Sequence, residues 1–152
     1  MYWANEEPTR IERANLNGEN KIIILNSTFT ISSLALDLRQ NVLYLTSTSK
    51  SGNAIQALSL TKRRLQIILN LSKQTPSGLA VSNRYIYWSN GTAVYRADKN
   101  TGKDITLVPG KFDEVMGIVV AKSHSEHGKG KQVCIFWNEI KYLAFSFNSS
   151  SI

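Results

Sequence analysis

The sequence predicts an all-β protein built from repeated four-stranded units. Tyrosine-centred segments recur 42 and 43 residues apart, at Tyr2, Tyr44 and Tyr87. Each repeat contains four short segments rich in aliphatic, β-branched and aromatic residues, and no segment has the 3.6-residue periodicity of a helix. Four short strands in every about 40 to 45 residues are typical of β-propeller blades, so we expect a partial β-propeller of four-stranded antiparallel blades.

Each predicted blade has four elements in a fixed order. The innermost strand is made of small and aliphatic residues, as tight packing requires, and is expected at 34–37, 78–81 and 117–120. The strand that carries the tyrosine is expected at 1–5, 43–47 and 86–90. The third strand alternates with a period of two, at 11–18, 55–60 and 94–102. The outer strand is a short apolar run, at 22–25, 65–69 and 105–108. Glycines at the tips of tight turns are Gly18, Gly52 and Gly91.

The composition fits one soluble domain with a modest positive charge. The chain has 152 residues, of which 42% are hydrophobic, and a net charge of +7. Its basic residues are scattered, and the only compact run is Lys62, Arg63 and Arg64. Because this run lacks the interleaved aromatic residues of nucleic-acid surfaces, we expect no nucleic-acid partner.

The single cysteine, Cys134, excludes an internal disulfide, and there is no Cys/His spacing that indicates a structural zinc site. No stretch reaches the roughly 20 apolar residues of a membrane helix, since the longest candidate, 133–147, is interrupted by polar residues. The start of the chain has no signal-peptide pattern and begins directly in a predicted strand, as a fragment would.

The repeats resemble a known family. The pairs Tyr2–Trp3 and Tyr87–Trp88, and Tyr44 between them, precede alternating segments such as Ile-Glu-Arg-Ala-Asn-Leu-Asn-Gly at 11–18. In this order they look like the YWTD (class B) repeats of the low-density lipoprotein receptor family. The resemblance implies a six-bladed extracellular propeller, of which this chain holds about half, toward the C-terminal end. It also implies structural repeat anchors at Tyr2, Trp3, Asp37, Tyr44, Tyr87 and Trp88.

The resemblance covers residues 1–120. Within that frame 1–25 are part of one blade, 34–69 and 78–108 are two whole blades, and 116–120 form one more inner strand. Residues 121–152 are expected to be a divergent C-terminal tail. Up to Cys134 this tail is similar to the segment by which the family's chain leaves the propeller, but the cysteine-rich module that follows there is absent.

The repeats depart from the family pattern after the aromatic pair. The Thr-Asp of the pattern is replaced by Ala-Asn at 4–5, Thr-Ser at 46–47 and Ser-Asn at 89–90. The inner-strand aspartate is kept only as Asp37, with Ser82 near the matching place in the next repeat. Because shorter or neutral groups replace a carboxylate, we expect weaker cohesion between blades. The repeats of another propeller family remain the alternative.

Four Asn-x-Ser/Thr sequons are candidate N-glycosylation sites, at Asn26, Asn70, Asn90 and Asn148. About two to three sequons are expected by chance in a chain this rich in Asn, Ser and Thr, so the motif is compatible with secretion without indicating it. Asn26 and Asn70 are the better acceptors, because Asn90 lies in a predicted two-residue turn.

Two further motifs have a functional and a structural interpretation. His124 lies near a position that the family uses in acid-triggered release, so it is a candidate pH-sensing residue; His124 and His127 lack the third ligand and rigid support of a metal site. The run Lys62–Arg64 either contacts acidic ligands or is a solvated hairpin turn, and the turn is favoured. It stands where the family has Asp-Gly.

No catalytic motif is present, so we expect no enzymatic activity, no cofactor and no bound metal. Other six-bladed propellers include hydrolases with a channel metal, and Glu12, Asn15 and Asp37 are suitable ligand types, but their strand positions indicate structural roles. Cys134 has no evident base beside it that would make it a nucleophile.

The resemblance implies an extracellular protein-binding module of a lipoprotein-receptor-like endocytic or signalling receptor. It would bind a protein ligand or neighbouring receptor modules. The alternatives are a Wnt co-receptor-like or basement-membrane (nidogen-like) propeller and, from another class, a propeller hydrolase with a channel metal. Half a ring leaves blade faces and strand edges open, so we also expect self-association through these edges.

Overall fold

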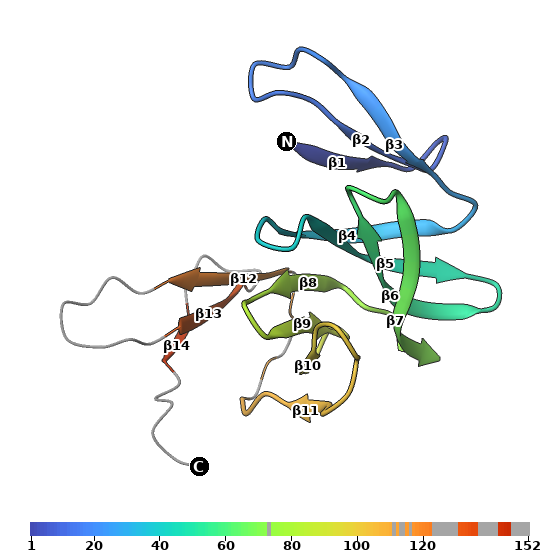
Figure 1. The fold of residues 1–152 in the computed structure, drawn as a ribbon. Coiled ribbons are helices and arrows are strands. Elements are labelled where there is room, and N and C mark those ends of the chain that lie inside the picture. The colour runs from blue at the N-terminus through green and yellow to red at the C-terminus, as the bar shows by residue number, and fades with distance from the viewer. Residues whose placement is uncertain are drawn as a thin grey trace.

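The computed structural model describes residues 1–72, 74–110, 112, 115, 117–122, 131–136 and 143–146, and from 121 onward it describes the backbone alone. In these ranges every regular element is a strand, and the strands form four separate antiparallel sheets (Figure 1). No helix of the described chain could cross a membrane. The predicted all-β class is therefore confirmed.

The first two sheets follow the predicted order of elements along the chain. The first consists of β1 (Tyr2–Asn5), β2 (Arg10–Arg13) and β3 (Ile22–Asn26). The second consists of β4 (Thr30–Asp37), β5 (Val42–Ser49), β6 (Gly52–Ser59) and β7 (Arg64–Ser72). The strand β4 starts earlier than predicted because a bulge between Ile31 and Ser33 lets pairing with β5 continue past the apolar core segment.

The third and fourth sheets complete the described chain. The third consists of β8 (Gly78–Val81), β9 (Tyr85–Ser89), β10 (Val94–Asp98) and the two-residue β11 (Thr106–Leu107). The fourth consists of β12 (Gly117–Lys122), β13 (Lys131–Phe136) and β14 (Leu143–Ser146). The segment expected as a divergent tail thus supplies two strands that extend the sheet begun by β12.

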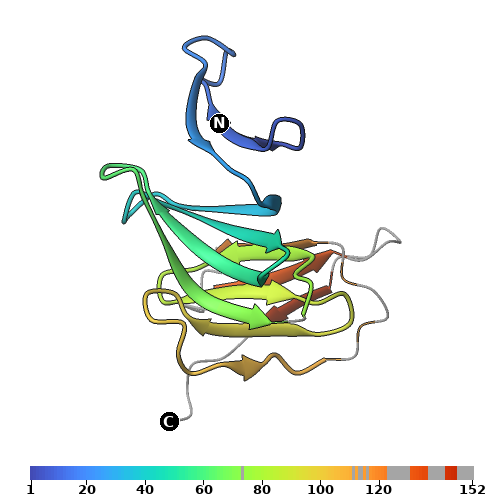
Figure 2. The same cartoon turned by 90° about the vertical axis from the view of Figure 1, so that its right-hand side faces the viewer.

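Consecutive sheets pack face to face, as blades do (Figure 2). The inner strand β4 contacts β8, and β8 contacts β12, so the inner strands lie side by side. One apolar cluster between the first two sheets includes Ile11 and Leu43, one between the second and third includes Tyr44 and Trp88, and one between the third and fourth includes Tyr87. The hydrophobic core is therefore divided into layers between blades, which confirms the partial propeller.

The predicted turn glycines adopt the positive φ that their positions require, at 87° for Gly18, 127° for Gly52 and 98° for Gly91. Between β10 and β11, Gly102 has a φ of 67°. The matching turn between β6 and β7 has no glycine, and Arg63 takes the positive φ there, at 50°. A non-glycine residue in this region is uncommon and strained.

Candidate functional site

The residues predicted as aromatic anchors lie in β1, β5 and β9 and are buried to different depths. Tyr44, Tyr87 and Trp88 are buried, whereas Tyr2 and Trp3 are half-buried. The Trp88 ring stacks on Tyr95, with the ring centroids 5.6 Å apart. Burial, followed by the negative charges of Asp37 and Asp98, raises the pKa of the Tyr44 hydroxyl to about 12. Tyr44 is therefore a packing group that stays neutral near pH 7.

Asn5 and Ser47, which replace the aspartate of the family pattern, form hydrogen bonds inside the first and second blades. In the first sheet Asn5 Nδ2 donates to Glu12 Oε2 at 2.7 Å. In the second, Gln56 Nε2 donates to Ser47 Oγ, also at 2.7 Å. Glu12 faces Trp3 across the strands as Gln56 faces Leu45, so these bonds occupy matching places. In the third sheet the stacked Tyr95 faces Trp88 instead.

Glu12 is a buried carboxylate held by two cations. Arg10 Nε lies 3.1 Å from Glu12 Oε1, and Lys21 Nζ lies 3.1 Å from Oε2. Burial by itself raises the pKa of the Glu12 carboxyl, but the hydrogen bonds from Asn5 and Lys21 and the charges of Arg10 and Lys21 outweigh it and hold the pKa below its ordinary value. Glu12 therefore stays ionised at neutral pH as a structural group.

Hydroxyl groups link neighbouring blades in a repeated arrangement. Ser32 Oγ lies 2.8 Å from Thr46 Oγ1 and donates to the carbonyl of Pro76, at 3.3 Å, where the chain enters the next blade. One blade later, Ser77 Oγ lies 2.7 Å from Ser89 Oγ and donates to the carbonyl of Val115 at 3.1 Å. The same two-hydroxyl step thus connects the second blade to the third and the third to the fourth.

A buried ion pair provides a further link between blades. Asp37, the last residue of β4, accepts a hydrogen bond from Nζ of Lys99, which follows β10 in the next sheet. The other carboxylate oxygen accepts the backbone N–H groups of Arg39 and Gln40, at 3.0 and 3.3 Å. Although burial alone raises the pKa of Asp37, the bond and charge of Lys99 and the N–H of Gln40 hold it below its ordinary value.

Asp37 also lines a cavity of about 380 Å³, which residues of the inner strands β4, β8 and β12 surround. The cavity is lined by the ends of three inner strands and the turns after two of them: Leu36, Asp37, Leu38, Arg39, Val81, Ser82, Asn83 and Val120. Leu38 is 77% exposed, and Arg39 and Asn83 are also exposed. In the part of the chain that the structure describes, Arg39 has no ion-pair partner. We call this cavity the channel mouth.

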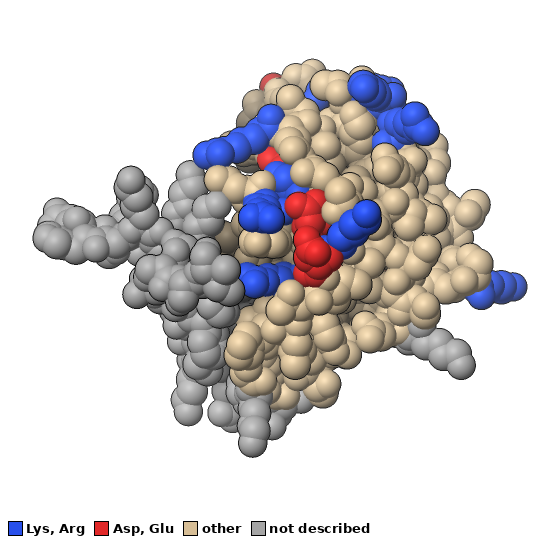
Figure 3. All heavy atoms as spheres, turned by 60° about the horizontal axis from the view of Figure 1, so that its bottom comes forward, with Lys and Arg blue, Asp and Glu red and all other residues tan. Residues whose placement is uncertain are grey.

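The basic turn between β6 and β7 divides its side chains between two surfaces. Lys62 and Arg64 line an open groove of about 410 Å³ together with Gln40 and Asn100, whereas Arg63 lines a separate cleft on the other side. Figure 3 shows cationic side chains dispersed over one face, with acidic side chains among them. No broad single-sign patch is visible on that face.

The carboxylates considered as channel-metal ligands lie in different blades. Glu12 is bound by Arg10 and Lys21, and Asp37 is bound by Lys99. Asn15 is exposed in the turn after β2. Among the residues described, no three His, Cys, Asp or Glu side chains gather closely enough to hold a metal ion. Glu12 and Asp37 therefore serve separate structural contacts.

Three of the four sequons lie in described residues. Asn26 ends β3 and is exposed; Asn70 is also exposed but lies within β7, which continues to Ser72. Asn90 is half-buried, and its Oδ1 accepts the N–H groups of Ala93 and Thr92. Asn148 and His124 lie outside the described residues. Glycosylation, pH sensing by His124 and self-association remain predictions.

Sequence reasoning missed Lys99 and the hydroxyl links. Lys99 follows β10 where Leu60 follows β6, and the backbone N–H of each donates to the preceding turn of its own sheet. The available signal was a lysine at a repeat position where the other two repeats have leucine, Leu16 and Leu60. The serines at 32 and 77 carried no such signal, because they precede the conspicuous apolar core of each inner strand.

Comparisons with known proteins agree with this architecture. No family model matches the sequence. The chain is 30% identical over 131 residues to low-density lipoprotein receptor-related protein 5 of Mus musculus, a match that covers 85% of this chain and 8% of the relative. It is 31% identical over 121 residues to the Homo sapiens protein of the same name, covering 78% of this chain and 7% of the relative. The chain thus spans less than a tenth of the length of either.

A solved structure supports the fold. The crystal structure of a nidogen/laminin complex aligns with a TM-score of 0.70 at 14% identity, covering 96% of this chain and 58% of that one. The layered blades and this alignment define a β-propeller module. Together with the two receptor-related matches, the aromatic repeats assign the chain to the YWTD-repeat propellers of the low-density lipoprotein receptor family.

Proposed function

We propose that the chain is an extracellular protein-binding module of a lipoprotein-receptor-like endocytic or signalling receptor. It has no catalytic role in this proposal and binds a segment of a protein ligand at the channel mouth. The family assignment supports the receptor context, since the sequence relatives are named receptor-related proteins. A Wnt co-receptor-like propeller is the nearest alternative, because such a propeller is built from the same repeats.

The observation that carries the proposal is the channel mouth itself. It is a concave site at the end of three neighbouring inner strands, so one ligand segment there contacts several blades at once. Leu38 is exposed beside Arg39, and arginine is one of the residues enriched at interaction hot spots. Asp37 is neutralised by Lys99, so among the lining residues that the structure describes the free charge at the mouth is that of Arg39. We therefore expect a ligand segment with an apolar and an acidic side chain.

The test is selection of peptides from a phage-displayed random library on the immobilised chain. Enriched peptides are expected to combine acidic and apolar residues. Their binding should be lost in Leu38→Asp and Arg39→Glu. It should persist in Ile105→Asp and Lys103→Glu, which make the equivalent changes, apolar to acidic and basic to acidic, at exposed positions outside the mouth. Circular dichroism of all four variants checks that the fold is kept. Enriched peptides that bind both mouth variants as tightly as the parent chain would refute this site.

A further inference from the structure

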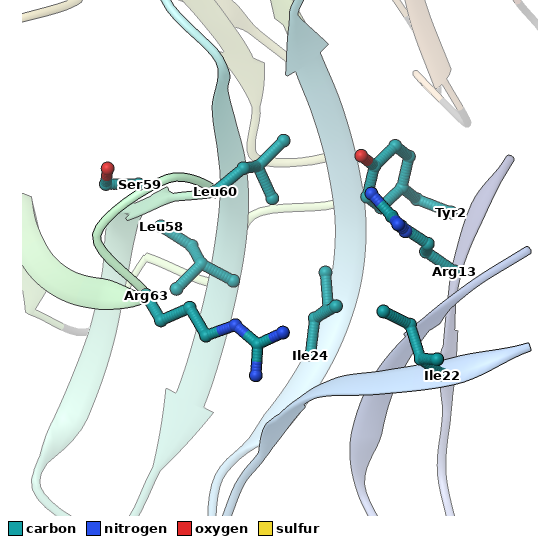
Figure 4. Close-up of a pocket in the computed structure, with 8 residues that line it drawn as sticks. All are labelled: Tyr2, Arg13, Ile22, Ile24, Leu58, Ser59, Leu60 and Arg63. Atoms are coloured by element: carbon teal, nitrogen blue, oxygen red, sulfur yellow. The ribbon is translucent and has the colours of Figure 1, made fainter.

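A second cavity lies between the first two blades, away from the channel mouth. It has a volume of about 70 Å³ and is lined by Tyr2, Arg13, Ile22, Ile24, Leu58, Ser59, Leu60 and Arg63. Figure 4 shows that the first sheet provides one side and the second sheet, with the β6–β7 turn, provides the other. We call it the interblade cleft. Its volume is several times the minimum of about 10 to 15 Å³ that a cavity needs to hold one water molecule, so a small group can enter.

Two exposed arginines from different blades line this cleft beside four aliphatic side chains. Arg63 reaches from the β6–β7 turn toward Ile24, and Arg13 lies along the Tyr2 ring on the opposite side (Figure 4). In the described part of the chain, neither arginine forms an ion pair. An anion that reaches both guanidinium groups would gain charge-assisted hydrogen bonds from each of them, beside an aliphatic wall.

The backbone at Arg63 has a positive φ in a turn without glycine. In the corresponding turns of the neighbouring blades the positive φ values belong to Gly18 and Asn20 and to Gly102 and Asp104, so each of those turns includes a glycine. Arg63 adopts a φ of 50°, a conformation that glycine accepts more easily. The second blade therefore keeps an arginine at a position where glycine favours the fold, and this arginine lines the cleft.

We propose that the interblade cleft binds a carboxylate on a short aliphatic stem. The carboxylate pairs with Arg13 and Arg63, and the stem packs on Ile22, Ile24, Leu58 and Leu60. The chemistry fits a free short-chain acid or the side chain of a protein, since both present the same group. Neither source depends on the channel mouth, so this proposal stands apart from the proposed function.

The test is an NMR titration of the folded chain with isovalerate and, in a separate sample, with isovaleramide. Isovalerate is expected to shift resonances of Tyr2 and Leu58 saturably, with a dissociation constant in the millimolar range because a ligand of so few atoms gains little. Isovaleramide, which has the same stem without charge, should bind about tenfold more weakly. A blocked peptide with one glutamate beside a leucine separates the sources: tighter binding of this peptide than of isovalerate indicates a protein ligand, and weaker binding indicates a free acid.

Variants then separate binding from packing. Arg63→Gly and Arg13→Gln should each weaken isovalerate binding about tenfold. Arg63→Gly should keep the melting temperature or raise it by about 2 to 4 °C, because it relieves a strained φ. Lys62→Ala removes a charge from the same turn outside the cleft, and Leu38→Asp alters the channel mouth; both should leave isovalerate binding unchanged. The proposal is overturned by equal binding of acid and amide, by unchanged binding in both arginine variants, or by no saturable shift.

Discussion

Asp37 and Lys99 are 62 residues apart in the chain and form a buried ion pair between consecutive blades. Lys99 is 2% exposed and Asp37 is 7% exposed, so the two charges neutralise each other with little contact with solvent. Lys99 also places its Nζ 3.5 Å from the carbonyl of Ser82, at the end of the neighbouring inner strand. The pair thus connects the turns that shape the channel mouth.

Removing one partner of this pair should destabilise the protein strongly. We expect Lys99→Leu to lower the free energy of unfolding by about 3 to 5 kcal/mol, because Asp37 is left buried without its counter-charge. The double variant Asp37→Asn with Lys99→Leu should recover most of this loss, since asparagine keeps an acceptor for the N–H groups of Arg39 and Gln40. Urea unfolding followed by tryptophan fluorescence measures both. Lys103→Leu, at an exposed lysine of the following turn, is the matched control, and an equal loss there would contradict the assignment.

The pH dependence of stability should reflect the same carboxylate. The folded-state pKa of Asp37 lies below its ordinary value of 3.8, so the unfolded chain takes up this proton first as the pH falls. The ionised pair therefore stabilises the fold fully above about pH 5, and its contribution is lost as the pH falls through 4 and below. Glu12 acts in the same direction. Thermal melts from neutral to acid pH should show a shallower loss in Asp37→Asn than in the parent chain; parallel curves would argue against this origin.

The hydroxyl links between blades should contribute measurably to stability. Ser77→Ala removes the partner of the buried Ser89 hydroxyl and the donor to the Val115 carbonyl. We expect a loss of about 1 to 3 kcal/mol, since a buried hydroxyl loses its partner. Thr75→Ala changes an exposed hydroxyl two residues earlier and should stay within about 0.5 kcal/mol of the parent. Chemical denaturation measures the free energy of unfolding of both variants. An equal loss in the two would mean that the Ser77 hydroxyl contributes little to the contact between blades.

The sequons should differ in occupancy when the chain is expressed through a secretory pathway. Asn26 and Asn70 are exposed on outer strands and should carry glycans, whereas the Asn90 side chain is engaged in its turn and should remain largely unmodified. Mass spectrometry after enzymatic deglycosylation measures each site. The variants Asn26→Gln and Asn70→Gln should each remove one step in gel mobility, and Asn90→Gln should remove none. Full occupancy of Asn90 would contradict this ranking.

Much of the fold could be predicted because each blade repeats its own local pattern. Tyr44 and Tyr87 lie in matching strands, and Gly18 and Gly91 take the positive φ that their turns require. Pairing beyond Lys122 could not be predicted in this way, because β13 and β14 do not repeat the aromatic segments of earlier blades. The glycine position in the turn after β6 was visible from the repeat pattern, but the positive φ of Arg63 and its place in the cleft were seen only in the structure.

The sequence by itself determined the class of fold, the order of strands and the family, because strand alternation, turn chemistry and the repeat period are local properties of the chain. Only the tertiary structure decided which distant residues meet. Lys99 meets Asp37, Ser77 meets Val115, and Arg13 lines one cleft with Arg63, each across the space between blades. Such contacts depend on how one sheet is rotated and stacked on the next, and this geometry arises when apolar faces pack together.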